Sequence, residues 1–368
     1  MSKTNQSTIP IDALRAVNTI VTHANCPDGI ASAMILHNAL PHARIVFARH
    51  GAPETVGMAA EPGMLFCDFS PPASRVQEFV DAGAIVLDHH RTARDVVAAF
   101  GPLGVFGDEV DDPGVCGAVL AFREVWHPLR FGSHVSAHKV AAVQDFAALA
   151  GVRDTWQRHD PRWEEACAQA AALTFWPVDG LLDAHVEDWP ARLAIGPALQ
   201  SRRAESVTRA IRDGMRIHIG SREVAILSTT DTSDAMDRLG GDGVVMVLGF
   251  GYRCEAGVPR MIVSLRGRGV DVAALARAEG GGGHTAAAGF TLDVGAEMGN
   301  PYRWAAEWCA RVLGAGGRAV GWADAAPREP QGAGRAPVGA AGARAAPPDR
   351  SLRAEEAEAS AAAPRAAP

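Results

Sequence analysis

The segment LDHHRTA places Asp88, His89 and His90 side by side directly after the apolar run AIV. Carboxylates and imidazoles together suit a divalent cation such as Mn²⁺, which accepts mixed oxygen and nitrogen ligands. The plain alternative is a polar loop. However, two adjacent histidines after a buried strand have no structural need to be there. The segment therefore indicates one corner of a metal site.

Other candidate ligands also follow apolar runs or end a helical pattern. His23 and Asp28 lie in HANCPDG after NTIVT, Asp68 follows GMLFC, and Asp154 ends LAGVRD. Each has a structural explanation when taken alone: a turn or a helix cap for Asp28 and Asp68, a solvated charge for Asp154, and a hydrogen-bonded core position for His23. Taken together, these carboxylates and imidazoles lie at the ends of several predicted strands and helices, which favours a metal site. Structural zinc is disfavoured, because such sites usually contain more cysteine.

The elements that carry these residues alternate between strand and helix. Residues 18–22, 44–48, 63–67 and 84–87 are apolar runs of strand length. GIASAMILHNAL and PPASRVQEFVDAG show helical spacing between them. The alternation predicts an α/β fold in which a mainly parallel sheet is flanked by helices. In such sheets, ligands bind at the carboxyl ends of the strands, where the candidate residues would meet.

The remainder of the chain predicts a second, smaller α/β domain. Residues 115–190 look mainly helical, 191–216 read as one long amphipathic helix, and REVAILST, GVVMVLGFG and RMIVSLRG read as strands. The predicted segments are an N-terminal extension (1–17), a catalytic domain (18–190), a linker helix (191–216), a substrate-binding domain (217–315) and a disordered Ala/Pro/Arg-rich tail (316–368).

Composition limits the class of protein. The 368-residue chain has a net charge of −7, which argues against a protein that coats long duplex nucleic acid but permits a small anionic substrate. No apolar run is long enough for a membrane span, and the N-terminus lacks the layout of a signal peptide. The six cysteines form no CxxC pair, so we expect reduced thiols in a cytoplasmic protein.

The second half carries its own signal in EGGGGHTAAAGF. Consecutive glycines before a small-residue helix start suit close approach of the backbone to an anion, although a flexible loop is the alternative. Upstream, Arg266 and Arg268 leave a strand and could supply forked donors to a phosphate; Arg268 could equally be a surface charge. The candidate phosphate contacts of the glycine run are Gly281, Gly282, Gly283 and His284.

On these motifs the chain resembles the DHH phosphoesterases with a DHH-associated C-terminal domain, the superfamily of nanoRNase/oligoribonuclease and RecJ-like proteins. HANCPDG resembles the first motif of the family, Asp68 the second, the DHH triplet the third and Asp154 the fourth. GGGGHTAAAG, with SLRG before it, is similar to the signature of the C-terminal domain. The resemblance covers roughly residues 18–315 and implies two domains with the active site in the cleft between them.

The resemblance also implies roles for individual residues. A pair of Mn²⁺ ions, with Mg²⁺ as the alternative, would be held by His23, Asp28, Asp68, His89 and Asp154, and Asp68 would bridge them. The substrate phosphate would be bound by His90, Arg266 and His284, with Asp88 orienting a neighbouring group.

One departure concerns the first motif, which in the family usually has two aspartates. Only Asp28 is present here, and Cys26 or Asn25 stands where the second carboxylate is expected. A thiolate would favour a softer metal, whereas an amide oxygen would weaken the site. The occupancy of one of the two metal positions is therefore open.

The expected function is metal-dependent hydrolysis of phosphate esters in short oligonucleotides or nucleotides such as 3′-phosphoadenosine 5′-phosphate. The chain after His284 has no room for the added oligonucleotide-binding domain of larger RecJ-like exonucleases, which favours short substrates. The alternatives are a cyclic-dinucleotide phosphodiesterase and a degenerate member that binds nucleotide or nucleic acid without hydrolysis. The sequence leaves a homodimer open.

Overall fold

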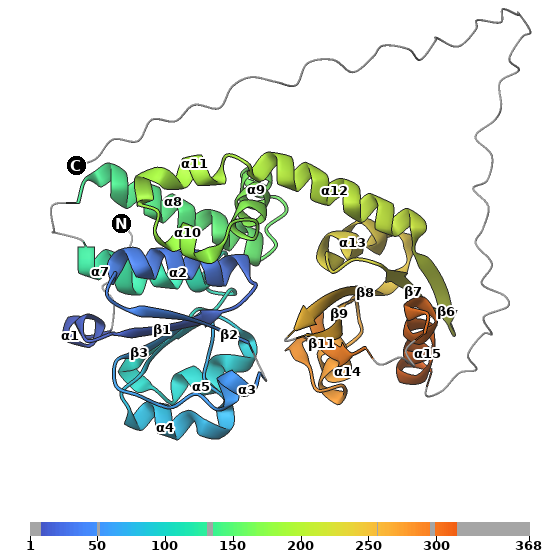
Figure 1. Ribbon diagram of the computed structural model, residues 1–368, viewed down its shortest axis with the longest axis horizontal. Helices are drawn as coiled ribbons and strands as arrows, with labels where there is room; N and C mark the ends of the chain where they lie inside the picture. The colour runs from blue at the N-terminus through green and yellow to red at the C-terminus, as the bar shows by residue number, and fades with distance from the viewer. Residues whose placement is uncertain (1–8, 50–51, 131–134, 256, 295–298, 315–368) are drawn as a thin grey trace, which may run out of the picture. The chain divides into compact units, whose positions relative to one another are not determined.

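The computed structural model describes residues 9–49, 52–130, 135–255, 257–294 and 299–314. These residues build two β-sheets, one from the first half of the chain and one from the second (Figure 1). The predicted disordered tail lies outside the described residues. Among the described helices, none is long and apolar enough to cross a membrane.

The first sheet is entirely parallel, with the strand order β2-β1-β3-β4-β5. Both of its faces are buried in the middle, because neighbouring residues such as Ile20 and Val21 pack into different apolar clusters. The predicted parallel sheet is thus confirmed, and β5 is an additional strand that the apolar runs did not indicate. The strands are β1 (Thr19–His23), β2 (Arg44–Ala48), β3 (Met64–Cys67), β4 (Ile85–Asp88) and β5 (Gly104–Phe106).

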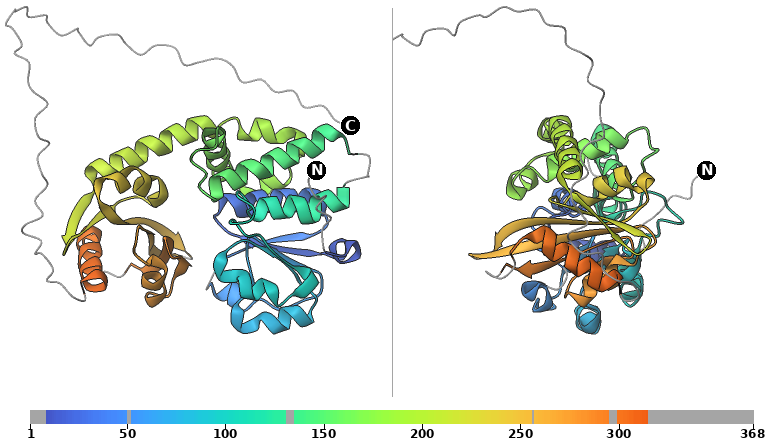
Figure 2. Two further views of the ribbon diagram at one scale, coloured as in Figure 1. Left: turned by 180° about the vertical axis from the view of Figure 1, so that it is seen from behind. Right: turned by 90° about the vertical axis from the view of Figure 1, so that its right-hand side faces the viewer.

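Helices cover both faces of this sheet. Figure 1 shows α2, α7 and α8 on one side and α4 and α5 on the other, and the reverse view in Figure 2 agrees. The stretch 115–190 is mainly helical, as predicted. The helical elements are α1 (Ile11–Arg15), α2 (Pro27–Ala39), α3 (Pro53–Val56), η1 (Ala73–Arg75), α4 (Val76–Asp81), η2 (Arg91–Ala93), α5 (Arg94–Ala98), η3 (Gly101–Leu103), α6 (Gly117–Leu120), the π-helical η4 (Ala121–Trp126), α7 (His127–Arg130), α8 (Ala137–Asp154), α9 (Trp163–Leu173), α10 (Val178–Leu182), η5 (Val186–Asp188) and α11 (Trp189–Leu193).

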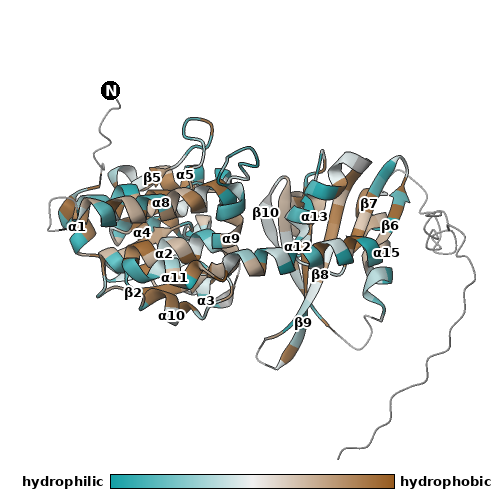
Figure 3. Ribbon diagram, turned by 90° about the horizontal axis from the view of Figure 1, so that it is seen from above, coloured by the Kyte–Doolittle hydropathy of each residue, from teal (hydrophilic) through white to brown (hydrophobic). Residues whose placement is uncertain are grey.

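The second sheet is mixed, with the order β10-β11-β9-β8-β7-β6. Only β7 and β8 pair in parallel among its described strands. In Figure 3 the edge strand β6 alternates between teal and brown, as expected for a strand with one buried face. Its elements are β6 (Met215–Ile219), β7 (Arg222–Leu227), α13 (Thr232–Leu239), η6 (Gly240–Asp242), β8 (Val244–Glu255), β9 (Val258–Gly267), α14 (Val272–Ala278), β10 (Gly282–His284), β11 (Ala287–Asp293) and α15 (Pro301–Leu313). The chain therefore has the predicted two-domain α/β layout.

The joining helix differs from the single helix predicted over 191–216. The chain forms α11, breaks, and begins α12 (Gly196–Asp213), and β6 already starts at Met215. Pro197 accounts for a new helix starting here, because proline favours the first turn of a helix. Gly196 allows close packing at the same point, because a Cβ on it would lie 2.2 Å from the carbonyl oxygen of Ala168.

The glycine run also differs from the prediction, because no helix starts after His284. Residues Gly282–His284 and Ala287–Asp293 form an antiparallel hairpin instead. Its glycines permit close approach of two strands, since a Cβ on Gly281 would lie 2.2 Å from the carbonyl oxygen of Gly289. The prediction that the N-terminus of a helix faces an anion at this segment is therefore wrong.

Candidate metal centre

The candidate ligands lie at the carboxyl edge of the first sheet, around the point where the strand order reverses. The sheet runs from β1 to β2 on one side and to β3 on the other, which makes the ends of β1 and β3 the switch point. His23 is the last residue of β1, and Asp68 follows β3 directly. Asp68 has a φ of 56°, a left-handed conformation that is uncommon outside glycine and that often occurs at functional sites.

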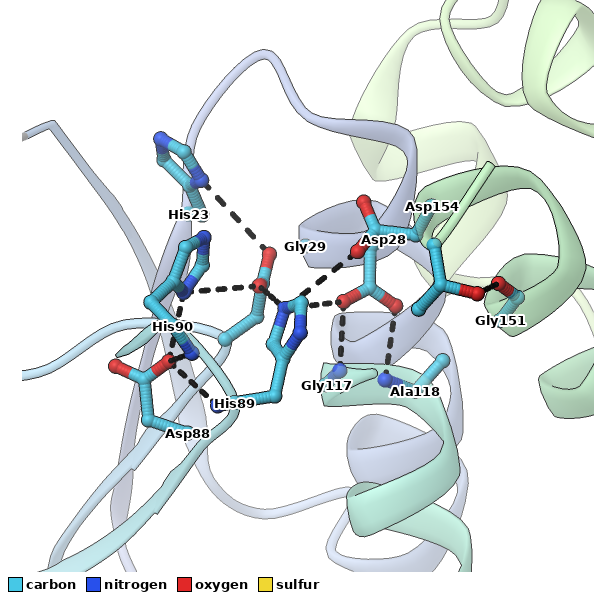
Figure 4. A network of polar contacts seen from close by, with 12 residues as sticks. His23, Asp28, Gly29, Asp88, His89, His90, Gly117, Ala118, Gly151 and Asp154 are labelled. Atoms are coloured by element: carbon cyan, nitrogen blue, oxygen red, sulfur yellow. Dashed lines mark hydrogen bonds and ion pairs between the residues drawn. The ribbon is translucent and has the colours of Figure 1, made fainter. Parts of the chain in front are cut away.

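The structure gathers the histidines and aspartates into two groups of possible metal ligands. One contains His23, Asp68 and His90, and the other contains Asp28, His89 and Asp154. Within each group, one ligand atom from every residue lies within 4.8 Å of the others. Figure 4 shows the labelled side chains of His23, Asp28, His89, His90 and Asp154 converging from separate elements of the chain.

The two groups meet at Asp68. Its Oδ1 lies 3.2 Å from Nε2 of His89, whereas its Oδ2 lies 3.8 Å from Nδ1 of His23. The carboxylate is 1% exposed, and its Oδ2 accepts no hydrogen bond from any described residue. Its Oδ1 also lies 3.9 Å from Nδ1 of His90, so the carboxylate of Asp68 stands between histidines of both groups.

Asp88 is buried behind the two histidines. Its Oδ1 accepts the backbone N–H groups of His89 and His90 at 2.8 and 3.0 Å and lies 2.7 Å from Nδ1 of His90. Its Oδ2 accepts the Ser70 hydroxyl at 2.6 Å. These contacts fix the turn after β4 and the orientation of the His90 ring. His90, which was predicted to contact the phosphate, thus lies with the possible metal ligands, and its contact with a phosphate remains a prediction.

Asp28 is held at the start of α2 by a segment distant in sequence. Its Oδ2 and Oδ1 accept the backbone N–H groups of Gly117 and Ala118 at 2.6 and 2.9 Å. The neighbouring Gly29 lets α2 approach β1, because a Cβ there would lie 2.2 Å from the carbonyl oxygen of His23. The carboxylate is consequently fixed within the second donor group.

The pKa values of Asp68, His89 and His90 are all raised by their surroundings. Burial and the charge of Asp28 raise the pKa of Asp68 well above its usual value, although His89 opposes the shift. Burial alone would lower the pKa of His89, but the carboxylates of Asp68, Glu109 and Asp154 raise it well above its usual value. Burial likewise opposes the shift of His90, whose pKa Asp88 raises to about 9. The carboxylates around the two histidines thus raise the pKa of both rings.

The residues present fit a divalent cation. The buried Oδ2 of Asp68 lacks a hydrogen bond from the described residues, and each group combines carboxylate oxygen with imidazole nitrogen. Oxygen and nitrogen donors of this kind are shared by Mn²⁺ and several other first-row metals, so the geometry shows a metal-binding capability and leaves the element open.

Cys26 and Asn25 take different positions at the altered first motif. Cys26 is the half-buried residue before α2, and its sulfur belongs to neither donor group of the described residues. Burial, and then the charges of Asp68, Asp154 and Asp28, raise the pKa of its thiol well above the usual value, which disfavours a thiolate. Asn25 is exposed and has a φ of 60°. The prediction that Cys26 or Asn25 replaces the missing aspartate as a metal ligand remains a prediction.

The candidate phosphate-binding residues lie on the second sheet. Arg266 on β9 donates from Nε to the Ser233 hydroxyl at 2.7 Å, and burial lowers its pKa to about 10. Arg268 is exposed and donates to the carbonyl oxygen of Gly240 at 2.9 Å. The run Gly281–His284 lies in and before the β10 strand. The predicted cleft between the two domains, and the roles of these residues, remain predictions.

Three features of the site have no counterpart among the residues predicted from the sequence. Glu109 lies 3.7 Å from Nδ1 of His89, Ser70 bonds to Asp88, and Gly117 bonds to Asp28. Glu109 comes shortly after β5, so recognising GVF as a further strand end would have drawn attention to it. The contact of Gly117 uses a backbone N–H, for which the sequence has no signal.

No protein-family model matches the chain, and no curated protein is similar to it in sequence. Among solved structures, the DHH domain of a protein described as a member of a family of ribosomal proteins matches with 12% identity and a TM-score of 0.51, covering 83% of this chain and 88% of that chain.

Two further structures match at lower TM-scores. A pGpG-specific phosphodiesterase from Vibrio cholerae has 14% identity and a TM-score of 0.32, covering 78% of this chain and 97% of its own. An exopolyphosphatase-related protein from Bacteroides fragilis has 12% identity and a TM-score of 0.38, covering 82% of this chain and 95% of its own. Likenesses at these TM-scores carry no argument. From the first match, the chain has the fold of a DHH-domain protein, the family that its motifs resemble.

Proposed function

We propose that the protein is a metal-dependent phosphoesterase that hydrolyses phosphate esters of short oligonucleotides or nucleotides. The observation that carries this proposal is the position of Asp68, whose buried carboxylate lies between histidines of two different donor groups. A buried carboxylate between two donor sets suits a pair of cations. A structural role would leave this concentration of buried charge without a purpose.

Divalent cations bound there would supply Lewis acidity towards water and towards the phosphoryl oxygens of the substrate. His23, Asp68 and His90 would hold one cation. Asp28, His89 and Asp154 would hold the other. Asp88 would keep the DHH turn in place, since it accepts both backbone N–H groups and contacts the His90 ring. We propose Mn²⁺ over Mg²⁺, because both groups contain imidazole and Mg²⁺ prefers oxygen ligands.

The substrate-binding part of the proposal rests on the second sheet. Arg266 is half-buried and carries a forked guanidinium suited to a phosphate oxygen pair. Arg268 and the Gly281–His284 segment would complete the contacts to substrate, a role that the resemblance implies for His284. The net charge of −7 supports a small anionic substrate over long nucleic acid. The six described cysteines are all free, which supports a cytoplasmic location.

The test is a hydrolysis panel with Mn²⁺, read by product analysis. The panel contains a dinucleotide, longer oligonucleotides, 3′-phosphoadenosine 5′-phosphate and a cyclic dinucleotide. We expect turnover of the dinucleotide or of 3′-phosphoadenosine 5′-phosphate, with loss on chelation. Turnover of the cyclic dinucleotide alone would favour the phosphodiesterase alternative. Binding in Mn²⁺ without any turnover would contradict the proposal and favour a nucleotide-binding protein, for which the altered HANCPDG motif is the supporting observation.

A further inference from the structure

We propose that Glu109 is a positioning residue for the second donor group, holding Nδ1 of His89 so that Nε2 of the same ring faces the carboxylates. The inference rests on the proposed metal-dependent function and adds a residue to it. Glu109 lies outside the motifs that indicated the site, in the segment after β5. The two nitrogens of the His89 ring face different groups, and this difference assigns a role to each.

Nε2 of His89 faces three carboxylate oxygens. It lies 3.2 Å from Oδ1 of Asp68, 3.5 Å from Oδ2 of Asp154 and 3.8 Å from Oδ2 of Asp28. This is the nitrogen that would bind a cation together with the aspartates. A metal-binding imidazole carries its remaining proton on the other nitrogen, which then needs an acceptor.

Nδ1 of His89 faces Glu109. It is buried, it makes no hydrogen bond to the described residues, and Oε1 of Glu109 lies 3.7 Å away. A movement of roughly half an ångström by the carboxylate would bring it into hydrogen-bonding distance. The Glu109 side chain is 42% exposed, so such a movement meets little packing resistance.

The segment that carries Glu109 is itself anchored. The backbone N–H of Gly107 donates to the carbonyl oxygen of Asp88 at 2.9 Å, which ties the segment to the DHH turn. The next residue, Asp108, accepts the backbone N–H of Val110 at 3.0 Å and pairs with Arg94. Glu109 is thus presented from a folded turn, and its place near His89 follows from these contacts.

The adjacent histidine has a carboxylate at the same ring nitrogen, at a shorter distance. Nδ1 of His90 lies 2.7 Å from Oδ1 of Asp88, so each histidine of the DHH triplet has a carboxylate at Nδ1. For His90 that carboxylate comes from the motif itself. For His89 it comes from Glu109, 20 residues further along the chain, and the motif alone does not reveal it. Carboxylate–histidine–metal arrangements orient the ring and raise its basicity.

The test measures Mn²⁺ binding to the full chain by calorimetry, without substrate. We expect Glu109→Ala to weaken Mn²⁺ binding about 10- to 100-fold, the usual effect of losing such a partner. Glu109→Gln keeps an oxygen acceptor and should restore part of the affinity. Asp111→Asn is the matched control, because it removes an exposed charge two residues away in the same turn. The free energy of unfolding of the metal-free variants should stay unchanged.

His89→Ala separates this inference from the proposed function. If His89→Ala binds Mn²⁺ as tightly as the wild-type protein, the metal assignment itself fails. If His89→Ala loses Mn²⁺ but Glu109→Ala binds normally, the positioning role of Glu109 is overturned and the metal centre stands. An equal loss in Asp111→Asn and Glu109→Ala would also overturn it, because the effect would then come from net charge.

Discussion

The backbone N–H of Gly117 donates a hydrogen bond of 2.6 Å to Oδ2 of Asp28, a residue 89 positions earlier in the chain. The bond links the start of α6 to the start of α2 inside the candidate metal centre. Gly117 also has no room for a side chain. A Cβ there would lie 2.4 Å from Cβ of Asp68 and 2.9 Å from Oδ2 of Asp28.

Replacing Gly117 by alanine should therefore displace Asp28 and Asp68. We expect weaker Mn²⁺ binding and a loss of about 1–3 kcal/mol in the free energy of unfolding, as is usual for overpacking. Calorimetry and urea denaturation measure the two effects. Gly180→Ala in α10 is the control, because nothing lies within 4 Å of its Cβ position and alanine favours a helix. Wild-type Mn²⁺ affinity in Gly117→Ala would contradict the assignment of Asp28.

Replacing Asp68 by alanine should nearly abolish Mn²⁺-dependent hydrolysis, because one carboxylate serves both donor groups. Asp68→Asn, which keeps the volume of the side chain, tests the stability. Without metal, this variant should be at least as resistant to urea as the wild-type protein. The reason is that burial and Asp28 raise the pKa of Asp68, so its ionisation opposes folding. Full activity in Asp68→Ala would rule out this role.

The pH dependence of the metal-free protein follows from His90. Asp88 raises the pKa of His90 to about 9 in the folded protein, against burial, compared with about 6.5 in an unfolded chain. A histidine with a raised pKa contributes stability below its unfolded pKa and loses that contribution as the pH rises through the folded pKa. The buried Asp68 acts in the same direction.

Urea denaturation in chelator should therefore show a falling free energy of unfolding between about pH 6.5 and 9. His90→Gln should make this part of the profile less steep, and the raised pKa values of His89 and Asp68 should account for the slope that remains. His159→Gln, which changes a histidine that belongs to neither donor group, should leave it as in the wild-type protein. A profile that is flat in the wild-type protein would show that the His90–Asp88 pair does not titrate as described.

Cys26→Ser decides whether the altered first motif supplies a ligand. The sulfur belongs to neither donor group, and its thiol is held protonated by burial and by the surrounding aspartates, which raise its pKa. We expect Mn²⁺ affinity within about twofold of wild type, since no metal–thiolate bond is lost. Asp28→Asn in the same motif is the comparison and should weaken binding strongly. A strong loss in Cys26→Ser would establish Cys26 as a ligand.

The residue types that end each strand, and hence the chemistry and the α/β fold class, follow from the amino-acid sequence alone. Apolar runs of period and length typical of strands predicted β1 to β4, and a parallel sheet places their carboxyl ends along one edge. Asp68 and His89 could be expected to meet there on these grounds. The family resemblance of HANCPDG and DHH rests on the same local information.

The division of the donors into two groups, and the contacts that support them, emerge only when the chain is folded. The pairing of Asp28 with Gly117 joins segments far apart in the chain, and the contact of His89 with Glu109 depends on how the turn after β5 folds. Likewise, Gly282–His284 became a strand because its glycines allow close pairing with Ala287–Asp293. Such contacts arise from packing between distant segments, so local composition and periodicity do not encode them in a readable form.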